Sequence, residues 1–158
     1  MKKLLTLILA VALCAPAFAQ VKIKVSEEKL LVNSIKALDG IQQVVHTDGK
    51  DSVILVPYKL PGNTRRLLAK DLRILQAALD DAQKAWDQKL KELSPDGSPL
   101  KDGSKELVIG QSEFEKINSA VDDLPLAKIH ISDLNLDDNA GISSSVLAGL
   151  DPIVEASP

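Results

Sequence analysis

Cysteine is almost absent from this 158-residue chain: Cys14 is the only one, and it lies in an N-terminal segment that we expect to be removed. No disulfide can then form, so the stability of the mature chain has to come from packing alone. Aromatic residues are also scarce, at 3% of the sequence. Because sugar-binding sites commonly stack aromatic rings against their ligand, a carbohydrate-binding role is disfavoured.

Basic residues are in deficit. The chain has 19 Lys and Arg against 22 Asp and Glu, a formal net charge of −3. The expected N-terminal removal takes Lys2 and Lys3 with it, which leaves a net charge of −5. Nucleic acids and anionic membrane surfaces both select a basic face. The charge balance therefore predicts neither as a partner.

Long hydrophobic runs are missing except for one of ten residues, 4–13, near the N-terminus. This run follows two lysines and precedes a small-x-small sequence that ends at Ala19, which together make the three parts of a secretory signal peptide. The run is too short to cross a bilayer, which takes about 20 apolar residues as a helix. We predict a signal peptide over residues 1–19, cleavage between Ala19 and Gln20, and a periplasmic or secreted chain without a membrane anchor.

Alternatives to this cleavage remain open. Cys14 allows a lipoprotein acylated on that cysteine, but lipoprotein processing requires a small residue before the cysteine and Leu13 is bulky. A cut after Ala17 is second best. An uncleaved anchor is disfavoured by the shortness of the apolar run.

The first half of the mature chain predicts a helix and then a hairpin. Ser26 is a suitable N-cap for a helix over residues 27–39, whose apolar positions recur every three or four residues. Strands are expected over residues 41–47 and 50–58 on either side of Asp48-Gly49, a pair typical of tight hairpin turns.

The strongest element is a long amphipathic helix over residues 64–93. Its apolar seam recurs in steps of four and three and comprises Leu68, Leu72, Leu75, Leu79, Ala82, Trp86 and Leu93. A seam of this kind packs against other helices.

The last third of the chain predicts short elements after a flexible loop over residues 94–105, which has two prolines and two glycines. The expected elements are a strand at 107–109, a helix from 112 to about 123 opened by a capping box at Ser112 and Glu115, a strand over 126–131 and a helix over 143–150. Together these patterns predict one small α+β domain over residues 20–158, in which the long helix packs with shorter helices and a β-hairpin or small antiparallel sheet.

Residues suited to catalysis are sparse. His46 and His130 both fall in predicted strands, and neither belongs to a pair with metal-ligand spacing. We interpret both as solvated or structural histidines, with a shared zinc site as the alternative. The sequence therefore predicts no catalytic residue, no cofactor and a protein that is not an enzyme.

An acidic loop over residues 132–141 carries Asp133, Asp137 and Asp138 together with two asparagines. Clustered oxygen ligands suit calcium. The EF-hand pattern is not matched, however, because the glycine comes late and the closing glutamate is absent. Turn-forming and helix-capping roles account for the same residues, so calcium stays a weak alternative.

Several short motifs resemble a family of small uncharacterised proteins of tailed bacteriophages and prophages. The motifs are Leu38-Asp39-Gly40, Val53-x-x-Val56-Pro57-Tyr58-Lys59, Arg65-x-x-Leu68-Ala69-Lys70-Asp71, Ile129-His130-x-x-Asp133-Leu134 and Val146-Leu147-Ala148-x-Leu150. The resemblance covers most of residues 30–155 and implies a phage or prophage origin, with no known activity and no catalytic residues to carry over. The signal peptide departs from that family and speaks against an intracellular assembly role.

Three functions follow as hypotheses. The first is an exported, non-enzymatic protein-interaction or structural protein of the bacterial envelope, with an unidentified protein partner and self-association left open. The second is a structural or accessory component of a phage virion. The third is a small enzyme or inhibitor with an unrecognised site, for which the loop at 94–105 would be the binding loop.

Overall fold

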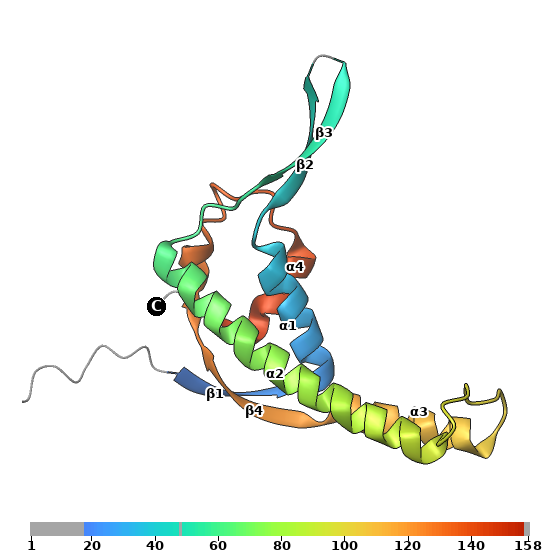
Figure 1. Ribbon diagram of the computed structural model, residues 1–158. Helices are drawn as coiled ribbons and strands as arrows, with labels where there is room; N and C mark the ends of the chain where they lie inside the picture. The colour runs from blue at the N-terminus through green and yellow to red at the C-terminus, as the bar shows by residue number, and fades with distance from the viewer. Residues whose placement is uncertain (1–17, 48, 157–158) are drawn as a thin grey trace, which may run out of the picture.

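The computed structural model describes residues 18–47 and 49–156 (Figure 1). Most of the predicted signal peptide lies outside these residues. Ala19 and Gln20, which flank the predicted cleavage site, lie in strand β1 (Phe18–Lys24).

Strand β1 is the first element of the described residues; the sequence patterns predicted no element before the helix at 27–39. It pairs antiparallel with β4 (Val121–Ala127), from Phe18 opposite Ala127 to Lys24 opposite Val121. Val21 and Ile23 are buried while Gln20, Lys22 and Lys24 are exposed, so one face of the strand packs on the body of the protein.

Helix α1 (Val25–Ala37) follows without a loop. The predicted N-cap at Ser26 is wrong: Lys24 is the N-cap, its backbone N–H donates to Glu27, and the Val25 N–H donates to the Ala120 carbonyl. Because the chain leaves a paired strand at Lys24, the helix begins two residues earlier than its composition indicates.

Gly40 connects α1 to the hairpin and has a backbone φ of +148°, which residues with a side chain rarely adopt. A Cβ at this position would lie 2.2 Å from the Val56 carbonyl oxygen. Glycine is therefore required where the hairpin leaves the body.

The hairpin of β2 (Ile41–Thr47) and β3 (Lys50–Val56) is confirmed, with Ile41 opposite Val56 and Thr47 opposite Lys50. Strand β3 ends at Val56, two residues earlier than predicted, because Pro57 has no N–H to continue the ladder.

The long helix is confirmed as α2 (Gly62–Leu93). Its N-terminal half is the buried half, where Leu68 and Leu75 lie in the core. Its C-terminal half packs against α3 (Lys105–Ser119), where the Trp86 and Phe114 rings meet edge to face at 5.1 Å (Figure 1).

Helix α3 corrects two expectations. Residues 107–109 are helical rather than extended, and Ser112 lies inside the helix rather than at its start. The N-cap is Ser104, whose hydroxyl oxygen accepts from the Leu107 N–H at 3.1 Å. The helix ends at Ser119 because β4 begins at Val121.

The predicted strand at 126–131 is also partly wrong. Its first residues belong to β4, and β5 (Ile129–His130) is a separate strand that pairs in parallel with β6 (Val154–Glu155). A 3₁₀ helix follows β5, and another precedes β6. Helix α4 (Ser144–Leu150) forms as predicted and is capped by Ser143.

One cluster of buried side chains unites these elements. It comprises Val21, Ile23, Leu31, Val32, Ile35, Leu38, Tyr58, Leu68, Leu75, Leu126, Ile129, Leu134, Ile142, Leu150 and Ile153. The fold class is confirmed as α+β: a long helix with shorter helices, a β-hairpin and a small antiparallel sheet.

Candidate functional site

The β2–β3 hairpin projects away from the rest of the fold, and no other helix or strand of residues 18–47 and 49–156 lies beside most of its length (Figure 1). Its two strands form their own two-stranded sheet and pack mainly on each other. An isolated hairpin of two strands is marginally stable in water, so a projecting one gains stability when another surface covers it.

Apolar side chains are exposed on both faces of this hairpin. Val44, Val53 and Leu55 share one face, and they are 58%, 64% and 57% exposed. Ile54 lies on the opposite face and is 44% exposed. A soluble hairpin normally alternates apolar and polar faces, whereas this one presents apolar groups on both. We name the four residues the hairpin patch.

Polar groups mark the far end of the hairpin. His46 and Asp51 lie opposite each other in the ladder, and an exposed hydrogen bond joins His46 Nδ1 and Asp51 Oδ1. This contact accounts for His46 without a metal. His130 lies in β5, in a different sheet, so the structure does not bring the two histidines together as a zinc pair.

The base of the hairpin is held firmly by the acidic loop. The Lys59 N–H donates to Asn139 Oδ1 at 2.9 Å, and the Lys59 carbonyl accepts from Asn135 Nδ2 at 2.7 Å. The Tyr58 hydroxyl donates to the Gly141 carbonyl at 2.8 Å, and the Tyr58 carbonyl accepts from the Arg65 guanidinium. Hydrogen bonds to the loop at 132–141 and to Arg65 therefore hold the base of the hairpin in place.

These bonds give the two asparagines of the acidic loop a structural role. Asn139 is buried and also donates to the Leu134 carbonyl at 2.7 Å. Asn135 has a φ of +47°, a left-handed conformation that asparagine tolerates. The turn-forming interpretation accounts for both residues.

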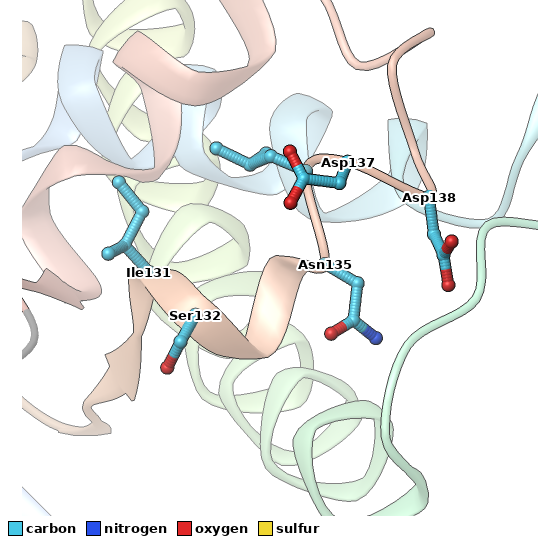
Figure 2. A pocket seen from close by; sticks show the side chains of 6 residues that line it. Ile131, Ser132, Asn135, Asp137 and Asp138 are labelled. Atoms are coloured by element: carbon cyan, nitrogen blue, oxygen red, sulfur yellow. The ribbon is translucent and has the colours of Figure 1, made fainter.

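The predicted calcium ligands are not assembled. Asp137 and Asp138 line a surface cavity of about 540 Å³ with Ser132 and Asn135, and their carboxylates point in different directions (Figure 2). Asp133 does not line this cavity. Over residues 18–47 and 49–156 no group of three or more His, Cys, Asp or Glu side chains is arranged to hold a metal ion.

Two buried carboxyl groups were missed at the sequence level: Glu28 on α1 and Asp71 on α2, both fully buried. Within residues 18–47 and 49–156, neither Glu28 oxygen nor Asp71 Oδ2 has a hydrogen-bond partner, while Asp71 Oδ1 accepts from the Ala127 N–H at 2.9 Å. Burial and then the neighbouring Asp122 raise the pKa of Glu28 to about 7. Burial likewise raises the pKa of Asp71 to about 6, against the lowering effects of the Ala127 N–H and Lys70.

The sequence carries a signal for both groups. Glu28 precedes Leu31 by three positions, and Asp71 lies between Leu68 and Leu75 on the apolar seam of α2. Each carboxyl therefore shares a helix face with buried leucines, which places it in the core.

Comparisons with known proteins give no relative for this fold: no protein-family model, no curated protein and no solved structure matches the chain. Among the helices within the described residues, none is long and apolar enough to span a membrane. The α+β fold with its projecting hairpin is therefore the basis for assigning a function.

Proposed function

We propose that this chain is an exported, non-enzymatic protein-interaction or structural protein of the bacterial envelope, which binds a protein partner through its β2–β3 hairpin. The observation that carries the proposal is the hairpin patch. Exposed apolar side chains that gather on one face mark an interaction site, and Val44, Val53 and Leu55 do so on an element that projects from the fold.

The support for the hairpin favours a binding role over a disordered appendage. The two ends of the hairpin approach each other closely at Gly40 and Val56, and the Tyr58–Lys59 segment is hydrogen-bonded to the loop at 132–141. A rigid mount reduces the entropy lost when the hairpin binds. The apolar groups on both faces suit an apolar cleft that encloses the hairpin, rather than a flat surface that covers one side.

A pair of matched variants tests this proposal. Val53→Ser with Leu55→Ser removes two residues of the hairpin patch. Val108→Ser with Leu30→Ser removes the same residue types at nearly equal exposure, 61% and 60%, from α3 and α1. In cells of the encoding bacterium, chemical cross-linking should give the same adducts for wild type and the control pair, and fewer for the hairpin pair.

The outcomes separate the alternatives. An adduct of twice the chain mass identifies a second copy as the partner, and a larger one identifies another protein. Identical adducts from all three proteins, or no adduct from any, would contradict the hairpin as the binding surface. Circular dichroism of the purified variants checks that each keeps its fold.

The export part of the proposal rests on the N-terminal sequence, and the phage or prophage origin rests on the motif resemblance. Mass spectrometry of the protein from its native source should find a chain that begins at Gln20. Head, tail or lysis genes beside its gene would support a phage origin. An intact Met1 within a virion would instead favour the virion component.

A further inference from the structure

Strand β4 meets two fully buried carboxyl groups, one near each of its ends. Glu28 of α1 lies against Asp122 near the start of the strand, and Asp71 of α2 accepts a hydrogen bond from Ala127 at its end. Both buried carboxyl groups belong to helices that contact the β1–β4 ribbon: Glu28 to α1, which contacts β1, and Asp71 to α2, which contacts β4. They therefore bear directly on how that ribbon is held.

At the first contact, two carboxyl groups face each other. The charged group that faces Glu28 is Asp122, and no N–H or O–H group of the described residues donates to either Glu28 oxygen. Two neighbouring ionised carboxylates repel each other, especially where burial shields one of them from water. A proton on Glu28 removes the repulsion, and the protonated carboxyl can donate a hydrogen bond to Asp122.

At the second contact, one carboxyl is half satisfied. Asp71 Oδ1 accepts from the backbone of β4, and no group in the described part of the chain is hydrogen-bonded to Asp71 Oδ2. Lys70, next to it on α2, is the charged group that acts on it. A proton on Oδ2 neutralises the buried group while Oδ1 keeps its bond to Ala127.

The ribbon has little else to hold its edges. It is a sheet of two strands, and among the described residues neither β1 nor β4 pairs with a third strand. Apolar side chains of one face, chiefly Val21, Ile23 and Leu126, attach the ribbon to the main core, and beside its end the Val25 N–H donates to the Ala120 carbonyl. Protonation of two carboxyl groups beside the same strand can therefore shift the equilibrium between a closed ribbon, packed on the body, and an open one.

We propose that the β1–β4 ribbon is a proton-controlled latch, closed while Glu28 and Asp71 hold their protons and loosened when these protons are lost. Loosening lets water reach the two carboxylates without unfolding the rest of the chain. The raised pKa values of Glu28 and Asp71 place this transition between about pH 6 and pH 7. The latch is independent of the hairpin and of any partner.

Hydrogen exchange at pH 5, 6, 7 and 8 tests the latch, with amide rates corrected for the intrinsic effect of pH. The variants are Glu28→Gln with Asp71→Asn, Glu28→Gln alone, and Asp123→Asn as the matched control. Asp123 is an exposed carboxylate on the same strand. In the wild type and the control, opening of β1 and β4 should rise at least about tenfold from pH 5 to pH 8. It should stay nearly constant in the double variant, and the single variant should lie between.

Three results would overturn the latch. The first is an opening of β1 and β4 that changes less than about twofold over this range in the wild type. The second is the same pH dependence in the Glu28→Gln protein as in the wild type. The third is an equal loss of protection in α4 and in the ribbon, which would mean global unfolding.

Discussion

Replacing Glu28 with glutamine should make the protein more stable at alkaline pH. Glutamine keeps the size and shape of the side chain but carries no charge at any pH. Its amide N–H can also donate to Asp122, and this hydrogen bond replaces the one from protonated Glu28. The variant thus removes the titration and little else.

The magnitude follows from the raised pKa of Glu28, which moves from 4.5 in the unfolded chain to about 7 in the folded one. A group with a raised folded-state pKa contributes its full stability below pH 4.5 and loses it as the pH rises through 7. At about 1.4 kcal/mol for each pH unit, the wild type should lose up to about 3 kcal/mol over this range. The variant lacks this loss, so at pH 8 it should exceed the wild type by up to about 3 kcal/mol.

Urea unfolding followed by circular dichroism at pH 4, 6 and 8 measures this difference directly. Glu115→Gln is the matched control, because Glu115 is an exposed carboxylate on α3. It should reproduce the pH dependence of the wild type. If Glu28→Gln is as sensitive to pH as the wild type, or less stable at pH 8, then Glu28 is not a buried neutral acid and the reasoning fails.

Three further predictions concern packing and capping. Leu75→Ala, at a fully buried position on α2, should lower the free energy of unfolding by about 2–5 kcal/mol in urea titrations, and a loss below about 1 kcal/mol would contradict its place in the core. Gly149→Ala should lower the free energy of unfolding by about 1–3 kcal/mol in thermal melts, because its Cβ would lie 3.1 Å from Ser34 Cβ. In the control Gly62→Ala, no atom lies within 4 Å of the added Cβ, so its stability should equal that of the wild type. Ser104→Ala should cost about 1 kcal/mol through loss of the α3 cap, and unchanged stability would instead favour a helix that starts at Ser112.

Local patterns predicted the elements that depend on near neighbours. The hairpin follows from a turn pair between two β-branched runs, and α2 follows from a long seam with one period. Strand β1 was missed because its partner, β4, lies about a hundred residues further along the chain, where no local pattern reports it. The apolar residues at 107–109 suit a strand or a helix, and the cap at Ser104 decides for the helix.

The functional features likewise divide into those visible in the local sequence and those that depend on tertiary structure. The residues of the hairpin patch were predicted to be in strands, but their exposure depends on how far the hairpin projects from the body. The histidines and the acidic loop drew attention through residue type, and the structure gives His46 and the two loop asparagines structural contacts instead. Glu28 and Asp71 are buried by tertiary packing, although their position on the apolar faces of α1 and α2 is visible in the sequence.

Site-specific photo-cross-linking tests the central claim, that the hairpin contacts a protein partner, most directly. A photoreactive amino acid replaces Val53 in one version of the protein and Val108 in another, at similar exposure. In cells of the protein's native source, irradiation should give a discrete adduct from position 53 and none from position 108. Absence of an adduct at position 53, or equal adducts at both positions, would contradict the hairpin as the contact surface.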